Sequence, residues 1–126
     1  MLFEIATKKT LAQIEEGIQA AAARHGFGFI AVHNLKETMK KKGVDFAGEC
    51  LIFEVCNPHQ AKKVLEANGA ISTALPCRIS AYRSGEGHKL ATILPTAMLA
   101  LFGNPELDPV AREVEDVILA MMKETA

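Results

Sequence analysis

Two strand-like segments follow one another directly in the second half of the chain, and this feature limits the possible folds more than any other. The segments CRISAYR, residues 77–83, and HKLATIL, residues 88–94, both alternate apolar and polar side chains. Between them, the SGEG sequence at residues 84–87 carries two glycines, which predicts a four-residue hairpin loop. A doubly wound α/β fold alternates strands and helices to its end, so this hairpin favours a different architecture.

Strands and helices are expected to alternate before the hairpin, and two helices are expected after it. The predicted earlier strands are residues 2–5, 27–33 and 49–56. The helices that follow them have the predicted N-caps Thr10, Asn34 and Asn57. The last two helices are predicted at Pro95–Phe102 and after an Asp108 cap. The order β-α-β-α-β-α-β-β-α-α predicts one α+β domain over residues 1–126, a two-layer sandwich whose mixed sheet of about five strands has helices mainly on one face.

Composition and charge narrow the class of protein. Of the 126 residues, 49% are hydrophobic and 23% are charged, a balance typical of one soluble globular domain. The net charge of −1 offers no basic footprint for nucleic acid. The longest uncharged stretch, Leu90–Asn104, is too short to span a bilayer, and the first residues do not form a secretory signal. We therefore expect a cytoplasmic protein, in which 3 cysteines, an odd number, are reduced thiols.

Cys56 is the residue whose chemistry is most open to question. It ends a predicted strand and precedes Asn57, Pro58 and a helix, so its thiol would feel the positive end of the helix dipole. His59, in the first turn, would strengthen that effect if protonated. Cys56 and His59 are thus candidate catalytic residues. The alternative is a packing role, because cysteine is often buried and Asn-Pro is a common way to begin a helix.

A zinc site is the other use that these cysteines could have. Structural zinc usually takes four ligands that arrive as two close pairs, and only Cys56 with His59 has that spacing. Cys50 and Cys77 would have to come from elsewhere in the sheet. We expect ordinary cysteines here, with no metal and no cofactor.

Strand alternation predicts which side chains share a face of the sheet. Leu51, Phe53 and Val55 belong to one face, and Cys77 alternates with Ile79 on that same core face. Cys56 would then lie on the opposite face, which argues against a disulfide with Cys77. The less covered face would also collect four polar side chains: Glu54, Arg78, Ser80 and Tyr82. Such a face could hold a small polar ligand or, more in keeping with its apolar neighbours, pair with a second copy of the chain.

Four segments together resemble a known family. They are NLKETMKKKGVDF (34–46), FEVCNPHQAKKVLEAN (53–68), LPCRISAY (75–82) and LPTAMLALF (94–102). In this order they are similar to the domain of unknown function 302 (DUF302) family of bacteria and archaea. The resemblance implies a compact two-layer domain of unestablished activity. It places the family's Cys-Asn-Pro at residues 56–58, its Leu-Pro-Cys-Arg at 75–78 and its Pro-Thr-Ala at 95–97, with no catalytic roles attached.

Two functions are carried forward from the sequence. The first is a small non-catalytic binding or sensing domain, homodimeric, with a ligand site near Glu54, Cys56, Asn57, Arg78 and Tyr82. The second is a thiol-dependent redox or sulfur-handling protein that uses Cys56 at the helix N-terminus. Whether the protein is an enzyme stays open at this point.

Overall fold

The computed structural model describes all 126 residues, which form an α+β fold in two layers. Its five strands are β1 (Leu2–Thr7), β2 (Gly28–Asn34), β3 (Cys50–Cys56), β4 (Cys77–Ser84) and β5 (Gly87–Ile93). Its α-helices are α1 (Leu11–Arg24), α2 (Leu35–Lys41), α3 (Pro58–Ala67), α4 (Pro95–Ala100) and α5 (Asp108–Thr125). Two short 3-10 helices are added, η1 (Gly69–Ala74) and η2 (Pro105–Leu107). The fold class and the order expected from the sequence are confirmed.

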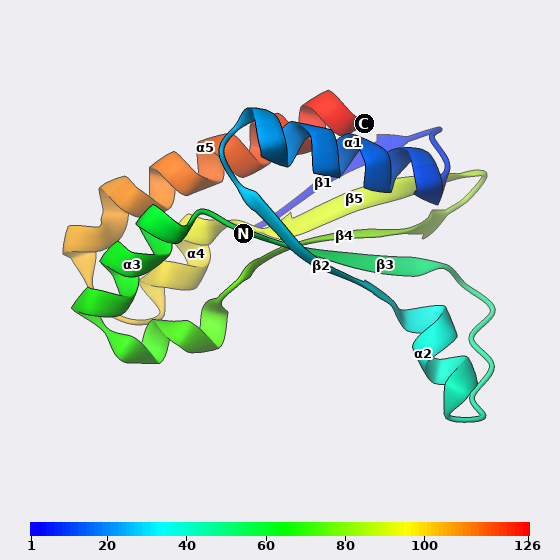
Figure 1. Cartoon of the computed structure of the whole chain (residues 1–126), viewed down its shortest axis with the longest axis horizontal. Helices are drawn as coiled ribbons and strands as arrows, with labels where there is room; N and C mark the ends of the chain where they lie inside the picture. The colour runs from blue at the N-terminus through cyan, green and yellow to red at the C-terminus, as the bar shows by residue number, and fades with distance from the viewer.

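The sheet has the order β1-β5-β4-β3-β2, with the hairpin strands inside and β1 and β2 at the edges. All four neighbouring pairs are antiparallel, so the expected mixture of parallel and antiparallel pairs is wrong. The reason is that the connections through α2 and through α3 both return the chain beside the strand it left. Figure 1 shows α1 and α5 lying together over one face of this sheet.

The hydrophobic core lies between this face and the two long helices. Alternate strand residues point into it, and Phe53, Val55 and Ile79 are fully buried. Helices α1 and α5 meet them with Ile14, Ile18, Ile118, Met121 and Met122, all fully buried. The predicted core faces of β3 and of the hairpin are therefore confirmed. The opposite face carries no helix layer and is called the open face below.

Helix starts follow local sequence rules at most positions. Thr10 and Gln13 form the predicted capping box, and Asn34 and Asn57 accept backbone N–H bonds as N-caps. Asp108 is instead the first residue of α5 and not its cap. The β-hairpin is also tighter than predicted, because Ser84 pairs with Gly87 and Gly85, with φ of 60°, lies in the turn.

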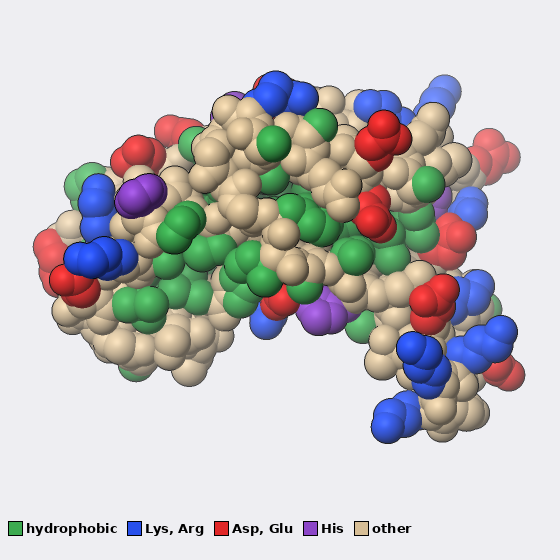
Figure 2. Space-filling view, in the orientation of Figure 1, with side chains coloured by type: hydrophobic (Ala, Val, Ile, Leu, Met, Phe, Trp, Pro, Cys, Tyr) green, Lys and Arg blue, Asp and Glu red, His purple; other side chains and the backbone are tan.

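Helix α2 projects from the rest of the molecule beside the end of β2 (Figure 1). It carries the lysine run of the sequence, and Figure 2 shows several basic side chains gathered on this projection. Lys36, Lys40, Lys41 and Lys42 are all exposed. Acidic Glu37 and Asp45 lie in the same segment, so this is a solvated helix face of mixed charge.

Candidate functional site

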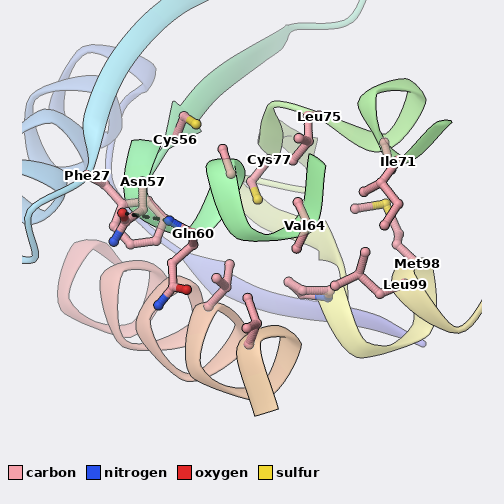
Figure 3. Close-up of a pocket in the computed structure, with 15 residues that line it drawn as sticks. Phe27, Cys56, Asn57, Gln60, Val64, Ile71, Leu75, Cys77, Met98 and Leu99 are labelled. Carbon is pink, nitrogen blue, oxygen red and sulfur yellow. Dashed lines mark hydrogen bonds between the residues drawn. The ribbon is translucent and has the colours of Figure 1, made fainter. Parts of the chain in front are cut away.

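A small cavity lies at the end of the sheet, where α3, η1, α4 and α5 meet below the last residue of β3. Its volume is about 50 Å³, and most of its wall is apolar. Figure 3 shows the side chains from these elements turned toward the shared space. The lining residues are Phe27, Cys56, Asn57, Gln60, Ala61, Val64, Ile71, Ala74, Leu75, Cys77, Pro95, Met98, Leu99, Val110 and Val114. None of them carries a charged group or a histidine ring.

The Cys-Asn-Pro sequence builds one wall of this cavity. Cys56 is the last residue of β3, and Pro58 occupies the first position of α3, where a missing N–H costs nothing. The Asn57 side chain accepts hydrogen bonds from the backbone N–H groups of His59, at 3.0 Å, and Gln60, at 3.3 Å. This cap fixes the start of α3 and thereby sets where the Gln60 side chain enters the cavity.

Gln60 is the polar residue that stands out in the cavity wall. Its amide oxygen Oε1 is buried and has no hydrogen-bond partner. Figure 3 shows the Gln60 side chain extending from α3 toward α5 among apolar neighbours. A buried acceptor without a partner is costly, at about 1–3 kcal/mol, and calls for an explanation. Gln60 is not among the residues predicted from the sequence, although a glutamine on the same helix face as Val64 is a detectable polar interruption of an apolar stripe.

The Cys56 thiol does not have the lowered pKa that its place before a helix suggested. All three cysteines are free, and burial raises the pKa of both Cys50 and Cys56. Burial, with a smaller contribution from Cys56, raises the pKa of Cys77 to about 11. The expected lowering of the Cys56 pKa is therefore wrong. The cause at Cys56 is desolvation by burial, which disfavours the charged thiolate.

Cys56 and Cys77 are both free thiols, and no disulfide joins them. Cys77 pairs with Val55, the residue before Cys56, and both cysteines line the cavity. Burial alternates along the whole of β3, so Cys56 is half-buried beside the fully buried Val55, as strand alternation predicts. His59, the second candidate catalytic residue, is exposed and does not line the cavity.

Glu54 and Arg78 do come together on the open face. They are directly paired across β3 and β4, with Arg78 Nε at 3.4 Å from the Glu54 carboxylate. His33 on β2 lies on the other side, with Nε2 at 3.0 Å from the same carboxylate. The hydrogen bond with His33, and a weaker one from Arg78, lower the pKa of Glu54. The carboxylate is thus already shared between two neighbours.

Tyr82 belongs to a different cluster. Its hydroxyl donates to Glu4 at 2.7 Å, and this bond raises the pKa of Tyr82. Tyr82 pairs with Cys50, whereas Cys56 lies six positions farther along β3, about 20 Å away at the rise of a strand. The five ligand-site residues expected from the sequence are therefore spread over three places: the cavity, the Glu54 cluster and the Glu4 cluster.

A further polar cluster joins the hairpin to the first loop and was not predicted. The His88 side chain is only 7% exposed, with Nε2 at 2.8 Å from Glu49 Oε1 and Nδ1 at 2.9 Å from the Lys9 carbonyl oxygen. Both partners are hydrogen-bond acceptors, so each can accept from a ring nitrogen that carries a proton. The hydrogen bond from His88, aided by Arg83, lowers the pKa of Glu49. This cluster fixes the hairpin to the loop before α1, and His88 and Lys9 also line a polar depression there.

No three His, Cys, Asp or Glu side chains converge as metal ligands would. The cysteines that a zinc site would need are divided, since Cys50 lies at the opposite end of β3 from Cys56. No helix of the structure has the length and apolar character needed to cross a membrane.

Comparison with known proteins identifies the family to which the chain belongs. Residues 3–125 match the model of the family described as domain of unknown function DUF302. The chain belongs to the DUF302 family. Its structure is similar to the crystal structure of an uncharacterized conserved DUF302 protein from Bacillus stearothermophilus, with a TM-score of 0.93 and 25% sequence identity over 99% of this chain and 98% of that one. No curated protein matches the sequence. The family resemblance stated from the sequence is confirmed, and it carries no activity with it.

Proposed function

We propose that this DUF302 chain is a small non-catalytic binding domain whose ligand occupies the cavity beside α3. The observation that carries the proposal is the unpartnered Oε1 atom of Gln60 in a mostly apolar wall. Ligand sites in proteins combine mostly apolar lining with a few polar groups that fix orientation, and this cavity has that composition. Its volume of about 50 Å³ suits a compact group or the end of a longer molecule.

The chemistry of the lining favours binding over catalysis. General acid–base catalysis needs a group that titrates near the working pH, and the cavity holds no histidine, carboxylate or lysine. Its two thiols, Cys56 and Cys77, both have raised pKa values because of burial. Asn57 is already used as the cap of α3.

Occupation of the cavity can be tested by NMR with a small organic probe. We expect 1-butanol at millimolar concentration to shift the amide signals of residues that line the cavity, with Val64 and Ile71 among them. Ala61→Leu fills space in the cavity wall and should abolish the shifts, whereas Ala67→Leu, an exposed position on the same helix, should leave them intact. Shifts that persist in Ala61→Leu, or that spread evenly over the surface, would remove the proposal.

The proposal includes a homodimer formed through the open face of the sheet. Leu2 and Ile93 are paired there and are 58% and 51% exposed, so a contiguous apolar area lacks cover. The charges on this face are balanced, since Glu54 has Arg78 and Glu4 has Lys89. Two copies could therefore meet face to face without net repulsion.

Light scattering on a sizing column tests the dimer. We expect twice the 13.6 kDa mass of the chain. Ser80→Glu adds a charge on the central strand of the open face and should shift the mass toward the monomer, whereas Gln19→Glu on the exposed side of α1 should not. A monomer at all concentrations, or equal behaviour of the two variants, would contradict the dimer.

The proposed compartment is the cytoplasm, where an odd number of cysteines stays reduced.

A thiol-dependent activity of Cys56 is the second candidate, supported by its place beside Cys77 in one cavity. Alkylation rates of the three cysteines against pH, followed by mass spectrometry, separate it from binding. Since burial raises the pKa of Cys56, we expect its alkylation to be slow at neutral pH. The rate should increase only above the ordinary thiol pKa of about 8.5. Fast reaction of Cys56 near neutral pH would instead favour thiol chemistry.

A further inference from the structure

The cavity beside α3 also limits the chemistry of its ligand. Resting on the proposed binding function, we propose that the ligand is a neutral hydrogen-bond donor, an alcohol-like O–H or amide-like N–H, attached to a compact apolar group. The donor would meet Oε1 of Gln60, and the apolar group would pack against the aliphatic wall (Figure 3).

Neutrality follows from the absence of charge in the wall. All fifteen lining residues are uncharged, and neither the Glu54–Arg78 pair nor the His88–Glu49 pair includes one of them. An ion moved from water into such a wall would lose its hydration without gaining a counter-charge. The site therefore selects against carboxylates, phosphates and ammonium groups.

The direction of the hydrogen bond follows from which polar atoms are still available. Asn57 Oδ1 already accepts two backbone N–H groups, so the cap satisfies it. The thiols of Cys56 and Cys77 are weak hydrogen-bonding groups. Gln60 Oε1 is a buried acceptor that lacks a donor, and a ligand that donates would satisfy it. A ligand with acceptors alone would leave it buried and unpaired.

The size of the cavity sets the expected affinity. A space of about 50 Å³ surrounds only a few heavy atoms, so a small probe should bind with a dissociation constant on the order of millimolar. A single hydrogen bond to a buried acceptor should change that constant by about tenfold.

Two isomeric probes isolate the hydrogen bond. 1-Butanol and diethyl ether have the same heavy atoms, but only the alcohol donates. Dissociation constants are measured by NMR titration for the wild type and for Gln60→Met, which keeps a flexible chain of similar length and removes the amide. We expect 1-butanol to bind the wild type about tenfold more tightly than the ether. This preference should disappear in Gln60→Met, with affinity for the ether unchanged.

Each other result has a distinct meaning. Equal binding of both probes to the wild type, or tighter binding of the ether, overturns the donor ligand but leaves the cavity as a binding site. Equal preference in the wild type and in Gln60→Met also overturns the role of Gln60. If neither probe shifts the cavity residues, the proposed binding function fails as well. The wild-type ratio decides the ligand class even if Gln60→Met does not fold.

Discussion

His88 provides the most direct test of how buried hydrogen bonds stabilise this fold. Replacing it by leucine keeps a side chain of comparable size and removes both hydrogen bonds. The bond to a charged carboxylate contributes about 1.5–3 kcal/mol, and the lower end applies because the Glu49 side chain is 33% exposed. The bond to the Lys9 carbonyl adds about 1 kcal/mol. We expect His88→Leu to lower the free energy of unfolding by about 2.5 kcal/mol.

Urea unfolding followed by circular dichroism measures this loss, and a thermal scan should show a melting temperature lower by about 10 °C. Arg83→Met is the matched control, because Arg83 Nη2 binds the same Glu49 oxygen at 2.9 Å but is 48% exposed. Such a surface pair contributes about 0.5 kcal/mol. Equal losses in the two variants would refute the claim that burial gives the His88 bonds their strength.

Acid should weaken the same contact. The hydrogen bond from His88 lowers the pKa of Glu49 in the folded chain, so its stabilising effect is complete above the ordinary carboxyl pKa of about 4.3. It is lost as the pH falls through the lowered folded value. The stability gap between wild type and His88→Leu should therefore narrow below about pH 4. A gap that stays constant into acid would show that Glu49 is not the partner that matters.

Three further substitutions test the core, the helix cap and the hairpin. Phe53→Ala, at a fully buried position, should cost about 3–5 kcal/mol in urea unfolding, and a loss under 1 kcal/mol would contradict the packing described. Asn57→Ala removes the cap of α3 and should lower the free energy of unfolding by about 1 kcal/mol. The backbone amides of His59 and Gln60 should also exchange their hydrogens faster. Unchanged exchange at these amides would contradict the role of the cap. Gly87→Ala would place a Cβ atom 2.5 Å from the Thr7 carbonyl oxygen, so we expect a lower melting temperature. A higher melting temperature would contradict this close approach of the two backbones.

The sequence predicts the layers and the order of elements because those depend on local patterns. The periods of 2 and 3.6 locate strands and helices, and caps such as Asn57 with Pro58 have a local mechanism. The antiparallel pairing of β2 with β3 depends on which strands become neighbours, a long-range choice that periodicity does not encode. The two-residue turn was missed because SGEG allows several hairpin lengths.

The site was harder to predict than the fold. Alternation along the strands correctly put Glu54 and Arg78 on the same face. It does not show that they pair directly, or that Tyr82 turns to Glu4 on a strand at the other end of the chain. The raised pKa of Cys56 depends on how much the surrounding helices exclude water, which a helix N-terminus alone does not reveal. The burial of Gln60 depends on how α3, η1, α4 and α5 pack around the cavity, and this packing is not encoded in the local sequence pattern.

A crystal structure of the protein soaked with 1-butanol tests the central claim most directly. We expect electron density for the alcohol inside the cavity beside α3, with its oxygen about 2.8 Å from Gln60 Oε1 and its carbon chain against Val64 and Leu99. A cavity that stays without the alcohol, or one in which the hydroxyl turns away from Gln60, would contradict it.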